Sequence, residues 1–193
     1  MTFDAAMALG WNHARAGRLE EASHAFGRAT AIAPGSPVAW RALADTRHAA
    51  GDRRGGDAGH MRAISLSVRE PRLVEAARAM AEDKIAVAEP LLRAQLKDAP
   101  TDVAAIRMLG ELATRLSRYG DAERLLGRAL ELAPSFDPAR HNLAVILYRQ
   151  TKSPEALAEV ETLLKRDAQN IAYRNLKAAI LVRVGDYETA IAI

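Results

Sequence analysis

The sequence predicts an all-α solenoid of stacked helical hairpins. Small residues recur at nearly constant spacing, with intervals of 34, 32, 34, 34 and 34 residues: Ala22, Gly56, Ala88, Ala122, Ala156 and Ala190. Other positions return in phase with them, namely Leu9, Leu43, Leu109 and Leu143 before them, and Pro34, Pro100 and Pro134 after them. A unit of this length is one helical hairpin, too small to bury its own apolar face and stable only when stacked on its neighbours.

Composition agrees with this fold class. The chain of 193 residues is 49% hydrophobic but only 5% aromatic. It is rich in Ala, Leu, Arg and Glu, whose side chains lose little conformational entropy when they enter a helix. The absence of cysteine excludes a disulfide framework and a thiolate metal site, and it suits a reducing cytoplasm. We find no signal-peptide pattern at the start and no apolar run of the roughly 18 residues that a membrane span requires. The sequence therefore predicts a cytoplasmic protein without a membrane span.

The repeat frame predicts one array covering residues 1–193. Its approximate repeats are 3–36, 37–70, 71–102, 103–136, 137–170 and an incomplete unit at 171–193. Because the last unit stops in mid-helix, we expect this chain to be the front part of a longer protein. The apolar residues Ile191 and Ile193 then lack a covering helix, which predicts fraying or self-association at this end.

The first repeat sets the pattern. An apolar helix through Met7 ends at Gly17, whose freedom at positive φ suits a helix terminus. A second helix runs from about Leu19 to Ile32, and Pro34 prevents its continuation.

The second and third repeats depart from the pattern in their second helix and their turn, respectively. Trp40 fills a large-residue position in the second repeat and is expected in the core. The second helix of that repeat is predicted to be weak, because three glycines each cost about 0.5–1 kcal/mol relative to alanine: Gly55, Gly56 and Gly59. The third repeat lacks a turn glycine and uses Glu82 and Asp83 instead.

The later repeats are more regular. The fourth is the clearest, with Leu109 and Gly110 in its first helix and Tyr119 just after its turn. In the fifth, Pro154 falls in the first turn of the second helix, where a missing N–H has no cost. The sixth turns at Gly185.

These positions together resemble the tetratricopeptide repeat over essentially the whole chain. The shared pattern is a large residue, a Leu followed by a small residue, a turn, an invariant small residue and a terminal Pro. The Leu and the small residue that follows it are Leu43–Ala44, Leu109–Gly110 and Leu143–Ala144. It implies a right-handed superhelix whose first helices line a concave face, and a role in binding proteins or peptides.

A narrower resemblance covers PTDVAAIRMLGELATRLSRYGDAERLLGRALELAPSFDPARHNLA and YRNLKAAILVRVGDYETA. Both stretches are similar to the N-terminal repeat array of bacterial tetratricopeptide-repeat sulfotransferases. That resemblance implies a bacterial protein whose catalytic domain, with its 3′-phosphoadenylyl sulfate, lies downstream. It brings no catalytic residue to this chain.

No residue pattern indicates an enzyme or a metal site in this segment. The five histidines never take the spacing of a helical metal site: His13, His24, His48, His60 and His141. The glycine-rich run from Gly51 to Gly59 lacks the G-K-[S/T] ending of a phosphate-binding loop, and no G-x-S-x-G motif is present. We therefore expect no cofactor and no metal.

Charge is segregated between the two helices of the later repeats. Their first helices carry eight cations, Arg107, Arg115, Arg140, Arg149, Lys152, Arg174, Lys177 and Arg183, against Glu111 and Asp137. The second helices of the fourth and fifth repeats are net acidic. With the resemblance, this pattern implies a basic concave groove for an acidic peptide; the alternative is ordinary solvated helix surface.

The candidate groove residues lie on the first helices of repeats four to six. They are Arg107, Glu111, Arg115, His141, Asn142, Tyr148, Arg149, Arg174 and Asn175. An amide in such a groove can hold a peptide backbone, and arginine presents a planar fork to a carboxylate. Weak nucleic-acid binding is a further alternative, disfavoured by the few aromatic residues and a net charge of only +3.

Trp11 has two open interpretations. It lies two residues past Leu9 and so on another face of that helix. It either anchors a ligand in a groove or covers the N-terminal end of the array.

Overall fold

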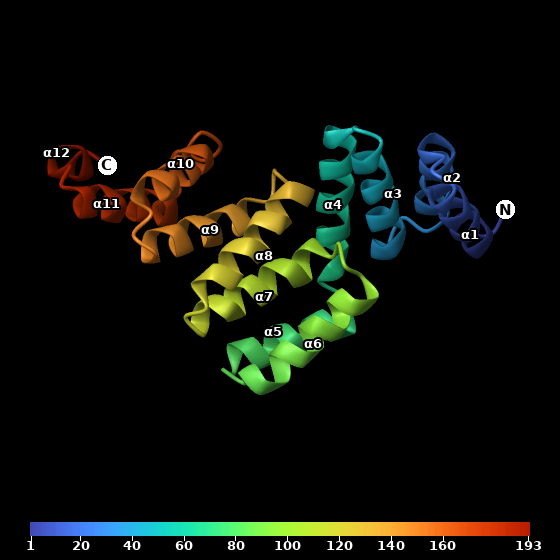
Figure 1. The fold of residues 1–193 in the computed structure, drawn as a ribbon, viewed down its shortest axis with the longest axis horizontal. Helices are drawn as coiled ribbons and strands as arrows, with labels where there is room; N and C mark the ends of the chain where they lie inside the picture. Colours follow the sequence, from blue (N-terminus) through green and yellow to red (C-terminus); the bar gives the residue numbers. More distant parts are fainter. The chain divides into compact units, whose positions relative to one another are not determined.

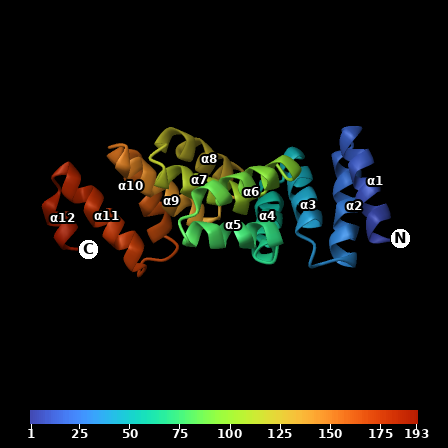
Figure 2. The same cartoon turned by 90° about the horizontal axis from the view of Figure 1, so that it is seen from below.

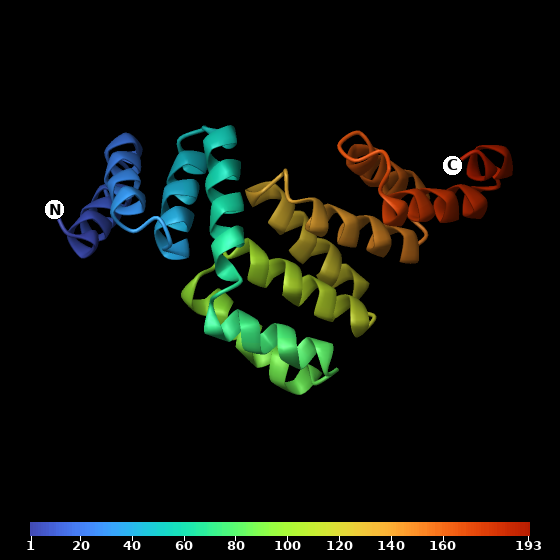
Figure 3. The ribbon, with the colours of Figure 1, turned by 180° about the vertical axis from the view of Figure 1, so that it is seen from behind.

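The computed structural model describes residues 1–193 as twelve helices joined by short turns (Figure 1). Their bounds are α1 Phe3–Arg15, α2 Leu19–Ile32, α3 Pro37–Ala49, α4 Arg53–Ser67, α5 Pro71–Ala81, α6 Ile85–Asp98, α7 Val103–Arg115, α8 Tyr119–Leu132, α9 Asp137–Arg149, α10 Ser153–Leu164, α11 Ile171–Val184 and α12 Tyr187–Ile191. Successive helices pair as hairpins, as α5 with α6 in Figure 2 and α3 with α4 in Figure 3. The predicted all-α architecture of stacked hairpins is confirmed.

Contacts along the chain define two compact units. Unit 1 comprises Met1–Met108 and Glu131–Ser135, and unit 2 comprises Leu109–Leu130 and Phe136–Ile193. The division passes through α7 and α8. Unit 1 therefore contains α1 to α6 entire, and unit 2 contains α9 to α12.

Each hairpin turns on one residue in the left-handed region. These residues are Gly17, Gly51, Asp83, Ser117, Thr151 and Gly185, with φ between 55° and 86°. Their spacing repeats that of the small residues. The turns expected at Gly17, Gly51, Asp83 and Gly185 are therefore confirmed, and Ser117 and Thr151 adopt a conformation that costs non-glycine residues free energy.

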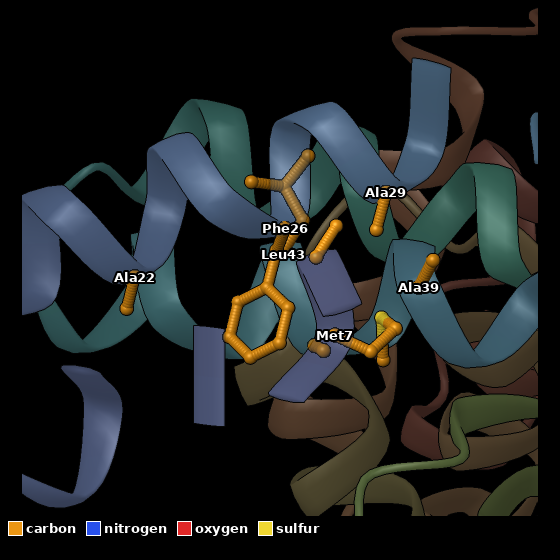
Figure 4. Packing of buried hydrophobic residues seen from close by; sticks show 8 residues of the cluster. Met7, Ala22, Phe26, Ala29, Ala39 and Leu43 are labelled. Atoms are coloured by element: carbon orange, nitrogen blue, oxygen red, sulfur yellow. The ribbon is translucent and has the colours of Figure 1, made fainter. Parts of the chain in front are cut away.

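Close approach of the two helices in a hairpin explains the small residues. Ala22 and Ala29 are fully buried against Phe26 and Met7 (Figure 4). A Cβ added to Gly10 would lie 2.4 Å from the ring of Phe26, which is itself fully buried. In unit 2, a Cβ at Gly110 would lie 3.0 Å from Leu126. A larger side chain at these points would separate the helices.

The glycine-rich helix of the second repeat is continuous from Arg53 to Ser67, in contrast to the expected weakness. A Cβ at Gly59 would lie 2.9 Å from the Cβ of Ala44, and one at Gly56 would lie 3.3 Å from the Ala44 carbonyl oxygen. The glycines therefore allow α4 to lie directly against α3, which propensity alone does not reveal.

Trp40 packs against the core of the first hairpins, as expected, while remaining partly exposed. Its indole Nε1 donates a hydrogen bond to the carbonyl of Pro34 at 3.0 Å. The interaction ties the end of the first repeat to the start of the second.

The C-terminal helix is the least buried element. No residue of α12 is buried, and Tyr187 and Ile191 are 61% and 86% exposed. None of the helices combines the length and apolar composition needed to cross a lipid bilayer.

We predict that Gly10→Ala lowers the free energy of unfolding by about 1–3 kcal/mol, because the added methyl group overpacks against Phe26. The matched control is Gly27→Ala in the interior of α2, where nothing lies within 4 Å of the added Cβ. That change should stabilise by about 0.5–1 kcal/mol. Urea unfolding measures both; shifts of the same sign and size would contradict the packing argument.

We also predict that amide protons from Tyr187 to Ile193 exchange much faster than those of α8, because α12 buries no side chain. Hydrogen exchange at a concentration where sedimentation shows a monomer measures this. Equal protection in the monomer would refute the prediction, whereas protection that rises with concentration would show self-association through this end.

Candidate functional site

The structure distributes the predicted groove residues over three helices. Glu111 and Arg115 lie on α7, and the others of unit 2 lie on α9 and α11: His141, Asn142, Tyr148, Arg149, Arg174 and Asn175. Arg107 also lies on α7 but belongs to unit 1. The site in unit 2 is therefore built from α9 and α11, together with the C-terminal half of α7.

Two ring contacts join α9 to α11. The His141 and Tyr173 rings lie with centroids 5.4 Å apart, tilted by 43°. The Arg183 guanidinium lies 3.6 Å from the centroid of the Tyr148 ring, a cation–π contact. These contacts hold the first helices of the fifth and sixth repeats side by side.

Burial sets the protonation of this aromatic pair. The His141 pKa is lowered from its ordinary 6.5 because burial disfavours the imidazolium form. The Tyr173 pKa is raised by burial first, and also by the carboxylates of Asp137 and Asp167. Both groups are therefore neutral at pH 7 and provide a polar but uncharged patch between the arginines.

Asn142 offers a hydrogen-bond donor with no partner in the chain. Its Nδ2 atom is buried from solvent and makes no hydrogen bond. Asn175, one repeat further on, is exposed and lines a cavity of about 310 Å³ together with Arg174. A buried amide without a partner is costly, and a bound carbonyl group would remove that cost.

The remaining predicted residues make local contacts. Arg115 pairs with Glu111 one turn away at 3.0 Å. Arg149 hydrogen-bonds the Tyr119 side chain and is the largest cause of the lowered Tyr119 pKa. Arg174 donates to the carbonyl of Ile193.

The segregated charges of the later repeats pair with one another across the hairpins. Arg140 bonds Glu159, Lys152 lies 2.8 Å from Glu123, and Lys177 lies 3.3 Å from Glu161. Three of the eight predicted cations therefore contact acidic residues of second helices, although Lys152 lies at the N-cap of α10 and not on a first helix as expected. The charge pattern thus has a structural role. On α9 and α11, Arg149, Arg174 and Arg183 are the cations that make no ion pair of this kind.

A second surface lies in unit 1, in the part of the chain where the sequence indicated Trp11 alone as a possible ligand anchor. A cavity of about 530 Å³ is lined by Trp11 of α1, by α3, by the start of α5 and by the segment from Gln95 to Thr101. No residue of α2 or α4 contributes to it. The first helices of this unit therefore face a hollow, and Trp11 borders it, which favours the ligand-anchoring interpretation of that residue.

A buried polar network forms the floor of this cavity. Arg41, only 7% exposed, donates to Asp102 at 2.9 Å and to Glu70 at 3.3 Å. Gln95 donates to Glu70 at 2.6 Å and to Asp102 at 2.8 Å. Asp102 also accepts a hydrogen bond from the Ala105 amide at the start of α7. Because each buried charge is paired and hydrogen-bonded, its loss of hydration is compensated.

The repeat frame contained a signal for this site. Arg107, His141 and Asn175 occupy in later repeats the position that Arg41 has in the second repeat. In the same way, Asp45 and Glu111 occupy the repeat position of Trp11. The residues that line the cavity in unit 1 thus occupy the same repeat positions as the candidates in unit 2. Counting charges in the later repeats alone missed them.

The chain contains no group of three or more side chains placed to hold a metal ion.

Comparisons with known proteins agree with this geometry. Residues 113–180 match the family model of the tetratricopeptide repeat. The APC/C hetero-tetramer Cut9–Hcn1 aligns with a TM-score of 0.60 and 17% identity, over 99% of this chain but only 38% of that chain. PilF of Pseudomonas aeruginosa aligns with a TM-score of 0.56 and 19% identity, over 98% of this chain and 87% of that one.

YrrB, a tetratricopeptide-repeat protein with an unusual peptide-binding site, aligns with a TM-score of 0.52 and 12% identity, over 89% of this chain and 90% of its own. No curated protein matches the chain in sequence. The family match covers residues 113–180, and the solved structures show that the whole chain has the fold of stacked helical hairpins found in tetratricopeptide-repeat proteins.

We predict that Lys152→Met destabilises the protein by about 0.2–1 kcal/mol at pH 7. The Glu123 pKa is lowered from 4.5, chiefly by its hydrogen bond from Lys152. A lowered carboxyl pKa contributes stability above its unfolded-state value, and that contribution is lost as the pH falls through the folded-state pKa. The difference between variant and parent should therefore shrink as the pH falls below 4.5.

Thermal unfolding between pH 3 and 7 measures this difference. Lys165→Met is the control, since Lys165 is exposed and makes no ion pair. A pH-independent effect of Lys152→Met would contradict the assignment of Glu123 as its partner.

Proposed function

We propose that this protein is a non-catalytic scaffold that binds a peptide segment of a partner protein on the first-helix face of α9 and α11. Tetratricopeptide-repeat proteins, whose family model matches residues 113–180, generally act in protein–protein interaction. The observation that carries the proposal is the Asn142 amide, which is buried without a hydrogen-bond partner and would donate to a ligand after a rotation of its side chain toward the surface.

The position of Asn142 supports a role toward a ligand. In the repeat frame it is equivalent to Ala42, which lines the cavity of unit 1. An amide at such a position donates to a peptide carbonyl and fixes the register of an extended chain without reading its sequence.

The charges of this face favour an acidic peptide. Arg149 lies on the same helix as Asn142 and Arg174 on α11, and Arg183 lies over the Tyr148 ring. Neutral His141 and Tyr173 add apolar area between them. Arginine bonds to carboxylates are charge-assisted and stronger than neutral hydrogen bonds.

The proposal predicts that Arg149→Glu with Arg174→Glu reduces binding of a labelled pool of aspartate- and glutamate-rich dodecapeptides at least tenfold, because a charge-assisted hydrogen bond contributes about 1.5–3 kcal/mol. Asn142→Ala should weaken every peptide in the pool by a similar factor. Fluorescence anisotropy measures the affinity, and circular dichroism verifies the fold.

The matched control is Arg15→Glu with Arg28→Glu, which makes the same change in net charge at exposed positions of α1 and α2. If the control lost as much affinity as the test variant, binding would reflect overall charge and not this face. If a folded Asn142→Ala variant bound the peptides with unchanged affinity, the proposal would lose the observation on which it rests.

The role as an arm of a bacterial sulfotransferase is the alternative assignment. It rests on the sequence resemblance alone, and the comparisons give it no support. The reading frame downstream of Ile193 tests it: a donor-binding domain for 3′-phosphoadenylyl sulfate would support the arm, and its absence would end that interpretation.

A further inference from the structure

The cavity of unit 1 has a composition opposite to that of the α9 and α11 face. Its volume of about 530 Å³ accommodates one or two side chains of a partner and not a whole helix. One part of its wall is apolar and accessible, since Trp11 is 42% and Val38 48% exposed. The rest of the wall carries the charged groups.

Both arginines at this cavity already have carboxylate partners. Arg41 pairs with Asp102 and Glu70, and Arg72 pairs with Asp98 at 2.7 Å. Together with Asp45, which neither arginine contacts, this region holds four carboxylates and two guanidinium groups. The surplus is two negative charges, so the arginines do not make the cavity a site for anions.

Asp45 is the carboxylate of this wall that no arginine or lysine contacts. Thr101 donates a hydrogen bond to its Oδ2 at 2.7 Å, which fixes its orientation. Its Oδ1 turns inward to the fully buried His60, 3.3 Å away, and has no hydrogen bond of good geometry. A third of the side chain is exposed at the cavity.

Trp11 supplies the second half of a cation site. Its indole packs edge-on against Phe26, with centroids 5.0 Å apart and planes at 72°. That contact anchors the ring and leaves much of it accessible at the cavity. An aromatic surface combined with carboxylates is the arrangement that stabilises an ammonium or guanidinium group, and it also packs the methylene stem of a lysine or arginine.

We propose that the cavity of unit 1 binds a lysine or arginine side chain of a partner peptide, with the cation at Asp45 and its stem against Trp11. This site goes beyond the proposed function, because it is a separate surface with the opposite charge preference. The chain as a whole carries a net charge of +3, so general electrostatic attraction does not explain binding of a cationic peptide here.

The test uses three labelled octapeptides that differ at one central residue: lysine, arginine or Nε-acetyl-lysine. Fluorescence anisotropy with the full chain should show saturable binding of the lysine and arginine peptides, and at least tenfold weaker binding of the acetylated peptide. Acetylation keeps the stem and removes the charge, so the difference isolates the cation.

Two variants locate the site. Asp45→Asn should weaken the lysine peptide at least tenfold and leave the acetylated peptide unchanged, whereas Trp11→Ala should weaken all three peptides. The controls are Glu75→Gln, an exposed carboxylate of α5 outside the cavity, and Tyr187→Ala, an exposed aromatic residue of unit 2. If Asp45→Asn does not fold, Asp98→Asn at the exposed rim replaces it and should also weaken the lysine peptide.

Equal affinity for the lysine and acetyl-lysine peptides would overturn the proposal. So would the absence of saturable binding, or an Asp45→Asn variant that binds like Glu75→Gln. Because the arginines of α9 and α11 are untouched, these results do not depend on the outcome of the acidic-peptide experiment.

Discussion

Close approach of the two helices within each hairpin is the constraint on which the rest of this structure depends. Gly10 faces the ring of Phe26, Gly59 faces Ala44, and Gly110 faces Leu126, each at a distance that leaves no room for a side chain. Stacking then buries the apolar surface that a single hairpin leaves exposed, and the first helices are free to carry polar residues.

Much of this arrangement was predictable because its signals are local. The second helix of the first repeat has the predicted bounds, Leu19–Ile32, since a glycine and a proline delimit it in the sequence. The turn at Asp83 was predictable from the repeat frame even without a glycine. Helix propensity describes an isolated helix, so it did not reveal that Gly56 and Gly59 pack directly against Ala44.

The polar contacts were less predictable, because they join residues far apart in the sequence. The sequence showed that charge is segregated between helices. Only the structure showed that Lys152 pairs with Glu123. Arg41 and Asp102 are 61 residues apart, and neither stands out in its own repeat. The candidate residues of α9 and α11 came from the resemblance, whereas the cavity of unit 1 needed the position of Trp11 relative to α3 and α5.

The shortened third repeat has a consequence for how this array becomes specific. The interval from Gly51 to Asp83 is 32 residues instead of 34, and α5 has 11 residues where α1, α3, α7 and α9 have 13. With about 3.6 residues per turn, α5 is therefore about half a turn shorter than these helices.

The irregular helix and its N-cap contribute Arg72 and Glu70 to the cavity wall. An array rebuilt from identical repeats would keep the hairpins and their stacking, yet it would lose the recess. The distinctive cavity of this array therefore lies where the spacing of the repeats is irregular.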